Sequence, residues 1–277
     1  MDQAGSIPNE TEPAVLILLT NDDGLFAPGL EALAEALAEL GPVRVVAPDR
    51  NQSGVSHQIS LHAPLRSHEV RPGWFMVQGT PADCVYLALH ELLPERPRVV
   101  VSGINAGPNL SYDVHYSGTV GGAMEGTLLG IPSIAVSATQ PARGYDPAAR
   151  FAQRLVRQVL DAGLPPDTLL NVNVPPGPAH RYQMTRLGHR LFRHHVERRD
   201  DPRGAPYYWI GGVPQPPEHR PGSDCNAIGD GVVSGAFTVV DRPADPHPAR
   251  TTANTTVKTP RMVMQGRRRR PGVGSRQ

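Results

Sequence analysis

The chain has 277 residues, 39% of them hydrophobic, which suffices for one large domain or two small ones with a substantial core. Its formal net charge of +1 gives no general attraction to nucleic acid or to an anionic membrane. Two cysteines are too few for a disulfide framework or a zinc cluster, and they favour a reducing compartment. Residues 1–13 lack the basic and apolar regions of a signal peptide, and no run approaches the roughly 18 apolar residues of a membrane span. We therefore expect a cytoplasmic protein that binds neither membrane nor nucleic acid.

The first periodic segments follow a strand–helix–strand order. Residues 15–19 form an apolar run typical of a strand buried on both faces. Leucines at positions 30, 33, 37 and 40 then have helical spacing, and Gly41 with Pro42 ends that helix. Residues 43–47 form the next strand. The later helices are expected at 82–93, 121–129 and 148–160, and the later strands at 99–101, 134–136 and 169–174. This alternation predicts an α/β fold with a Rossmann-like, mostly parallel sheet and helices on both faces.

We expect a single domain over residues 14–240, between a flexible N-terminal extension (1–13) and a polar tail rich in arginine and proline (241–277). Within the domain, residues 180–222 break the pattern, because arginine and histidine crowd residues 189–199 and a short aromatic strand follows at 207–210. We interpret this stretch as a hairpin or arm that leaves the core. A last apolar strand covers residues 232–240.

The most informative polar cluster is Asn21-Asp22-Asp23-Gly24, directly after the first strand. Ligands of open parallel sheets bind beyond the carboxyl ends of the strands. Two adjacent carboxylates repel each other, and a bound divalent cation makes their ionised forms favourable. The alternative is that the aspartates only form an Asx turn and a helix cap.

Two further clusters follow later strands. Residues 47–56 form a polar loop with hydroxyl groups, which alone would be an ordinary surface loop. Residues 101–109 are rich in glycine and asparagine, whose amide oxygens suit Mg²⁺ or Mn²⁺. Ser117-Gly118-Thr119 then leads into a helix, whose free N–H groups favour an anion such as phosphate, although a plain Ser/Thr cap would also explain a helix start.

Seven segments together resemble the SurE family, the survival-protein-E nucleotidases. They are residues 18–29 (LLTNDDG with APG), 46–54 (VAPDRNQSG), 79–85 (GTPADCV), 101–109 (VSGINAGPN), 116–120 (YSGTV), 171–175 (NVNVP) and 201–204 (DPRG). The resemblance covers roughly residues 14–235. After Ser234 the chain departs from the usual family pattern, so oligomer contacts of that stretch are not transferred.

The resemblance implies a divalent-metal site formed by Asp22, Asp23, Ser53 and Asn105, holding Mg²⁺ or Mn²⁺. It also implies hydrolysis of nucleoside 5′-monophosphates, and in some members of 3′-nucleotides and short polyphosphate. Asn109 and Ser117-Gly118-Thr119 match the segment beside the phosphate, and Asn21 and Ser56 are further candidates for substrate contacts. Family members form dimers or tetramers that exchange arms, which fits an arm at 180–222.

The mechanism expected from these residues is metal-assisted hydrolysis, in which Asp22 and Asp23 are the catalytic carboxylates. Asp23 is a candidate base, and ligand and base roles remain open. A covalent aspartyl-phosphate route needs the motif Asp-x-Asp, and here Gly24 stands two residues after Asp22, where that motif has its second aspartate. His57, His62 and His115 lie near the motif loops, and one could protonate the leaving oxygen, although such histidines are more often polar loop residues.

Three other classes of protein share some of these features. A dinucleotide-binding oxidoreductase is disfavoured because residues 118–122 lack the G-x-G-x-x-G spacing, and a phosphate-loop NTPase lacks its motif altogether. A nucleotide sensor or RNA-binding protein without turnover would draw on the arginines between 190 and 199 and at 267–270. Such runs are more often solvated faces or tails.

Overall fold

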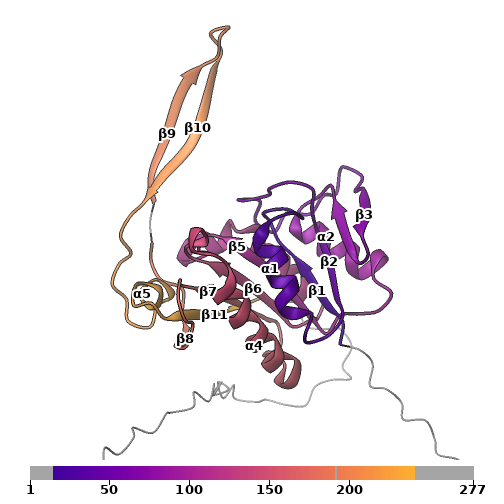
Figure 1. The fold of residues 1–277 in the computed structure, drawn as a ribbon. Coiled ribbons are helices and arrows are strands. Elements are labelled where there is room, and N and C mark those ends of the chain that lie inside the picture. Colours follow the sequence, from indigo (N-terminus) through magenta and orange to yellow (C-terminus); the bar gives the residue numbers. More distant parts are fainter. Residues whose placement is uncertain (1–14, 191, 241–277) are drawn as a thin grey trace, which may run out of the picture. The chain divides into compact units, whose positions relative to one another are not determined.

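A nine-stranded sheet forms the centre of the protein (Figure 1). The computed structural model describes residues 15–190 and 192–240. In space the strands follow the order β3-β4-β2-β1-β5-β6-β7-β11-β8. Their bounds are β1 Ile17–Thr20, β2 Val43–Pro48, β3 Ser67–Arg71, β4 Trp74–Val77, β5 Val99–Ala106, β6 Ser133–Ala138, β7 Thr168–Val174, β8 Tyr182–Thr185 and β11 Val233–Val239. The strands from β4 to β7 pair in parallel, while β3 runs antiparallel to β4 and β11 antiparallel to β7.

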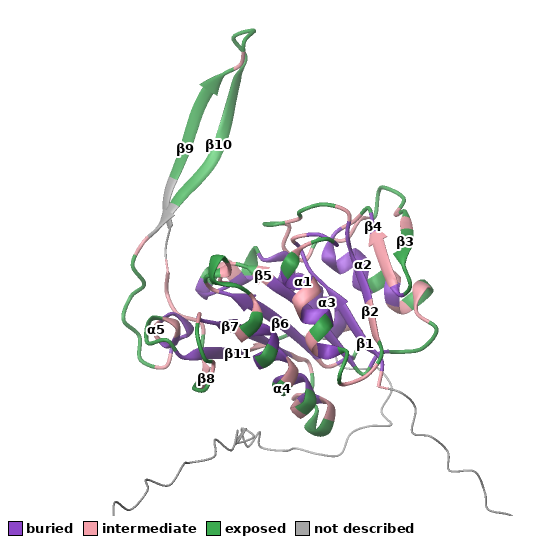
Figure 2. Ribbon diagram, viewed as in Figure 1, coloured by how far each residue is buried: buried purple, intermediate pink, exposed green. Residues whose placement is uncertain are grey.

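Two pairs of helices cover the sheet. The helices are α1 Pro28–Leu37, α2 Pro81–Leu87 (continued by a π-helical turn, Ala88–Leu92), α3 Gly118–Leu128, α4 Asp146–Ala162 and α5 Asp224–Gly229. Helix α1 packs against α4, and α2 packs against α3. The α2 side is filled by apolar residues that include Leu18 of β1, Val46 of β2 and Val85 of α2. Figure 2 shows the buried central strands between these layers. The expected mostly parallel sheet with helices on both faces is confirmed.

Local sequence explains where the first elements begin and end. All residues of β1 are buried, as its continuous apolar run predicts. Helix α1 starts with Pro28 at its first turn and buries Leu30, Leu33 and Leu37 on one face. Helix α2 begins with a capping box in which Thr80 and Asp83 bond each other's backbone N–H groups. Because β1 and β2 pair in parallel, the loops that follow them emerge at the same edge of the sheet.

The sheet is wider than the alternating pattern predicted. Strands β3 and β4 form a hairpin at one edge, and no expected strand covered them. Most residues of β3 are exposed, so its sequence lacks the apolar run that marks a central strand. The segment that leaves the core is also shorter than the predicted arm at 180–222, because β8, at the start of that range, joins the main sheet beside β11. The helix expected from residue 121 begins at Gly118.

The remaining excursion is a separate hairpin of β9 (Phe192–Asp200) and β10 (Pro206–Pro214), which pair antiparallel with each other. It confirms the expected hairpin. Its described side chains are exposed, among them Tyr208, Trp209 and Ile210 (Figure 2). The expected extension at 1–13 and the tail at 241–277 lie outside the described residues. Among the helices that the structure describes, none is long and apolar enough to cross a bilayer.

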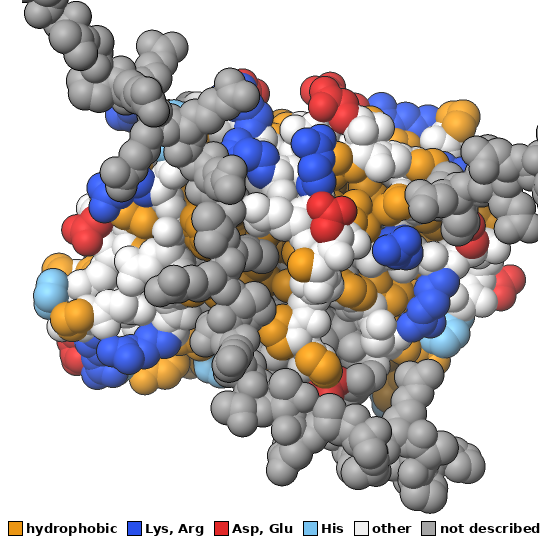
Figure 3. All heavy atoms as spheres, turned by 90° about the horizontal axis from the view of Figure 1, so that it is seen from below, with side chains coloured by type: hydrophobic (Ala, Val, Ile, Leu, Met, Phe, Trp, Pro, Cys, Tyr) orange, Lys and Arg blue, Asp and Glu red, His pale blue; other side chains and the backbone are white. Residues whose placement is uncertain are grey.

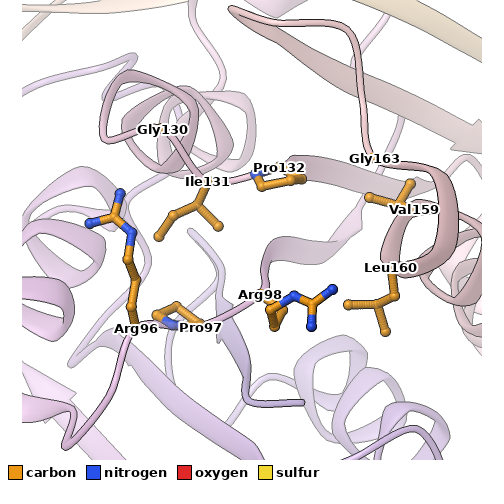
Figure 4. Close-up of a pocket in the computed structure, with 9 residues that line it drawn as sticks. All are labelled: Arg96, Pro97, Arg98, Gly130, Ile131, Pro132, Val159, Leu160 and Gly163. Carbon is orange, nitrogen blue, oxygen red and sulfur yellow. The ribbon is translucent and has the colours of Figure 1, made fainter. Parts of the chain in front are cut away.

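A cavity of about 450 Å³ lies at the amino ends of β5 and β6 (Figure 4). Arg96 and Arg98 line it beside apolar residues that include Ile131 and Leu160. Figure 3 views the molecule from below and shows apolar side chains interspersed with basic ones. Arg96 donates through Nη2 to the Leu129 carbonyl, just past the end of α3, which is a helix-capping contact. This cavity lies at the edge opposite the polar motifs.

Candidate metal and phosphate site

The polar motifs meet at the carboxyl ends of three neighbouring strands. Strands β2, β1 and β5 are adjacent in the sheet and parallel, so the segments that follow them emerge at the same edge. Asp22 and Asp23 follow β1, Ser53 follows β2, and Asn105 stands at the end of β5. The loop after β5 then leads into α3. The four predicted metal ligands therefore belong to three segments of one edge.

Asp22 is buried, with 3% of its surface exposed, and it lies against the start of α3. The Thr119 hydroxyl donates a hydrogen bond to its Oδ1. Gly118 leaves room for the aspartate, because a Cβ there would lie 2.8 Å from the Asp22 Cβ. Burial raises the pKa of Asp22 and the Asp23 charge adds to this, while the hydrogen bond from Thr119 opposes it.

Asp23 is half-buried and is held by the other two segments. The Ala106 N–H donates to its Oδ2 at 3.0 Å, and the Asn51 amide donates to its Oδ1 at a longer 3.4 Å. Burial raises the pKa of this carboxyl, and the Ala106 hydrogen bond opposes the rise. Burial raises the pKa of Tyr145, and the Asp23 charge raises it further. Tyr145 therefore lies within electrostatic reach of the site.

Asn51 ties the loop after β2 to this pair, a role that the sequence did not reveal. Its Nδ2 contacts Asp23, and its Oδ1 accepts from the Ser53 N–H at 2.8 Å. The neighbouring Gln52 N–H donates to the Asp22 carbonyl at 2.7 Å. Ser53 is exposed, so its hydroxyl is accessible to a ligand. The only sequence signal for Asn51 is its place within the 46–54 motif.

Asn105 brings an amide oxygen to the same edge. Its Nδ2 donates to the Gly107 carbonyl at 2.9 Å, which fixes the amide and leaves Oδ1 as the atom that could bind a cation. The register between β5 and β6 shifts between Ser102 and Asn105, and this irregularity redirects the end of β5.

The residues fit a hard divalent cation. Within the described residues, no basic side chain forms an ion pair with Asp22 or Asp23, and both carboxyls have raised pKa values. A cation would remove the repulsion that opposes their joint ionisation. No three His, Cys, Asp or Glu side chains gather anywhere in the described chain. Oxygen donors from Ser53 and Asn105 would therefore complete the set, as suits Mg²⁺ or Mn²⁺.

The first turn of α3 has two sets of donors, one that binds Asp22 and one that is open to a phosphate. Ser117 is the N-cap, and its hydroxyl accepts from the Val120 N–H at 3.1 Å. The Thr119 N–H interacts with the Asp22 carboxylate. The Gly118 N–H has no protein partner within the described residues, so it is the donor in this turn most available to an anion.

Three predicted substrate residues have defined structural partners. Asn21 exchanges hydrogen bonds with the Gly24 backbone, so the Asx turn after β1 is formed by Asn21 and not by the aspartates. Ser56 donates to the His115 carbonyl at 2.7 Å. Asn109 is buried, and its Nδ2 donates to Ser137 at 2.9 Å. Two asparagines of β7, Asn171 and Asn173, donate to the Asn109 carbonyl. These contacts position the loops, and direct contact of the three side chains with a substrate stays a prediction.

A model described as "Survival protein SurE" matches residues 17–194, which is more than half of the chain. The chain belongs to the SurE family. A protein named 5′-nucleotidase SurE from Anaeromyxobacter sp. (strain Fw109-5) is 56% identical over 222 residues, covering 79% of this chain and 87% of that protein. A protein of the same name from Myxococcus xanthus (strain DK1622) is 56% identical over 216 residues, covering 76% and 82%.

The fold agrees with a solved member of the SurE family. The crystal structure of the SurE protein from Aquifex aeolicus superposes with a TM-score of 0.73 at 43% sequence identity. The match covers 83% of this chain and 95% of that one. The family expected from the seven segments is therefore confirmed by both sequence and fold.

Proposed function

We propose that the chain is a divalent-metal-dependent phosphatase that hydrolyses nucleoside 5′-monophosphates to nucleosides and phosphate. The observation that carries this proposal is the contact between the buried Asp22 carboxylate and the start of α3 at Gly118 and Thr119. A metal-binding carboxylate and an anion-binding helix start then share one site. The SurE relatives that are named 5′-nucleotidase support the substrate class.

Asp22, Asp23, Ser53 and Asn105 would hold the ion. When bound, a divalent ion supplies Lewis-acid polarisation of the phosphoryl group and lowers the pKa of water. Thr119 keeps Asp22 in place for this role. Asp23 is suited to accept the proton of the attacking water at Oδ1, whose contact to Asn51 is the longer of its two hydrogen bonds. The Gly118 N–H and the dipole of α3 bind and orient a phosphate oxygen.

The proposal extends to 3′-nucleotides and short polyphosphate as secondary substrates, because these also present a terminal phosphoryl group to the same edge. Mg²⁺ and Mn²⁺ are the candidate ions. A cytoplasmic location stays a prediction.

We also propose a homodimer or homotetramer in which the β9–β10 hairpin contacts a second copy of the chain. A two-stranded hairpin alone is marginally stable in water. This one exposes Tyr208, Trp209 and Ile210 on successive positions of β10. Burial of these side chains against another copy would stabilise the hairpin and explain its aromatic composition.

The test is phosphate release from AMP, GMP, CMP and UMP and from their 3′ isomers, with Mn²⁺, with Mg²⁺ and with EDTA. We expect metal-dependent release from the 5′-monophosphates that is abolished by the chelator. Absence of release with either metal from folded protein would remove the enzyme proposal and favour a nucleotide-binding protein without turnover.

A further inference from the structure

A buried carboxylate on α3 is paired with a histidine of the loop after β2. The His57 Nε2 lies 2.7 Å from the Glu125 Oε2, and the two side chains are 25% and 7% exposed. Within the described residues, His57 is the only hydrogen-bond or ion-pair partner of the Glu125 carboxylate. Helix stability does not explain this glutamate, because a carboxylate near a helix C-terminus opposes the helix dipole and its burial is costly.

The face of α3 that carries Glu125 is shaped to receive this loop. Gly121 lies one helical turn before Glu125 and therefore on the same face. A Cβ on Gly121 would lie 2.4 Å from the Ser56 carbonyl oxygen and 3.2 Å from the His57 Cα. Gly121 thus leaves room for the backbone of Ser56 and His57, and Glu125 binds the His57 side chain.

The same loop carries Ser53. At its first end, Asn51 and Gln52 bond the Asp23 side chain and the Asp22 carbonyl. At its second end, the Ser56 N–H donates to the Tyr116 carbonyl at 3.0 Å, and His57 reaches Glu125. Between these ends Ser53 is exposed, and no atom of the described residues lies within 4 Å of a Cβ built on the neighbouring Gly54. The position of Ser53 therefore depends on the anchors on either side.

We propose that His57 and Glu125 are a pair of positioning residues that holds Ser53 at the metal site and Ser56 beside the start of α3. The proposal rests on the proposed function, because it assigns Ser53 to the metal. The pair acts through the loop and touches neither the substrate nor the ion. Partners that orient a metal ligand typically change metal affinity or activity by about 10- to 100-fold when removed.

The experiment compares His57→Ala, Glu125→Ala, the double variant and the conservative His57→Gln, whose amide can still donate to Glu125. His62→Ala is the matched control, since His62 is an exposed histidine of the same loop that makes no hydrogen bond or ion pair with α3 within the described residues. Mn²⁺ binding without substrate is followed by electron paramagnetic resonance, at a temperature at which thermal unfolding shows every variant to be folded. AMP hydrolysis is measured in parallel.

We expect Mn²⁺ affinity to fall by about tenfold or more in both alanine variants, with no further loss in the double variant. His57→Gln should recover most of the affinity, and His62→Ala should match the wild type. Wild-type Mn²⁺ affinity in folded His57→Ala and Glu125→Ala would overturn the proposal. Because Mn²⁺ binding needs no turnover, an inactive wild type that binds Mn²⁺ would count against the proposed function alone.

Discussion

Gly118 and Asp22 lie so close that a Cβ on the glycine would be 2.8 Å from the Cβ of the aspartate and 3.0 Å from its Oδ2. The start of α3 can approach the end of β1 only because residue 118 has no side chain. This contact joins the two halves of the proposed site, since Asp22 is a proposed metal ligand and the Gly118 N–H is the proposed phosphate donor.

Gly118→Ala should displace Asp22, because two buried carbon atoms cannot approach to 2.8 Å without movement. We expect at least about a tenfold loss of Mn²⁺ affinity, as for other changes that misplace a metal ligand. Isothermal titration with Mn²⁺ measures this. Gly229→Ala in α5 is the control, since a Cβ there would have no neighbour within 4 Å in the part of the chain that the structure describes. Equal affinities in the two variants would show that the contact does not position Asp22.

Thr119→Val keeps the shape of the side chain and removes the hydroxyl that donates to Asp22. The pKa of Asp22 should rise further, because that hydrogen bond favours the ionised carboxylate. Loss of a buried partner costs about 1–3 kcal/mol of unfolding free energy at neutral pH. Urea denaturation compares it with Thr127→Val, whose hydroxyl bonds only the Ala123 carbonyl of the same helix. A loss of stability no larger than that of Thr127→Val would contradict the assigned role.

Without metal, stability should fall as the pH rises. The pKa values of Asp22 and Asp23 are raised above 3.8 in the folded state, so these two carboxyls bind more protons in the folded chain than in the unfolded chain between 3.8 and their folded-state values. Across that window the unfolding free energy therefore decreases with increasing pH. Calorimetry in EDTA at a series of pH values measures this, and Asp23→Asn should reduce the slope.

A divalent ion should reverse this effect at neutral pH, because it binds the ionised carboxylates. At a free concentration of about 100 times its Kd, it stabilises the folded chain by roughly 2.7 kcal/mol. The same calorimetric series with Mn²⁺ tests this. A melting temperature that does not change when Mn²⁺ is added at neutral pH would argue that the two aspartates do not form a metal site.

The hairpin should determine the oligomeric state. Ile210 is 92% exposed on β10, and its replacement by glutamate places a charge where the proposal buries an apolar side chain. Light scattering should give a smaller mass for Ile210→Glu than for the wild type. Val70→Glu, at an exposed apolar position of β3, should keep the wild-type mass. An unchanged mass for Ile210→Glu would mean that the hairpin makes no contact between copies.

The parts of the fold that the sequence predicted are those in which burial leaves a periodic trace. The apolar run of β1 and the leucine spacing of α1 both reflect complete burial of one element. Strand β3 was not predicted because an exposed edge strand has no apolar periodicity. Helix α3 was expected to start at residue 121 and not at Gly118, because glycine disfavours helices; in the structure Gly118 is required by its close contact with Asp22.

In the candidate site, too, some residues could be predicted from the sequence and others could not. Asp22 and Asp23 could be proposed from their place after a buried strand, where two adjacent carboxylates are unusual. The role of Asn51 was not visible, since its contact with Asp23 joins residues that are 28 positions apart. The pairing of His57 with Glu125 spans 68 positions and likewise depends on the packing of a loop against a helix.

The most direct test of the account is AMP hydrolysis by the wild type and by Asp23→Asn, measured side by side as Mn²⁺ is raised to saturation. Asparagine keeps the size of the side chain and removes the charge that would bind the ion and accept the proton. We predict metal-dependent phosphate release by the wild type and a loss of at least about 100-fold in the variant that saturating Mn²⁺ does not restore. Near wild-type turnover by Asp23→Asn at saturating Mn²⁺ would contradict the proposed metal site and its chemistry.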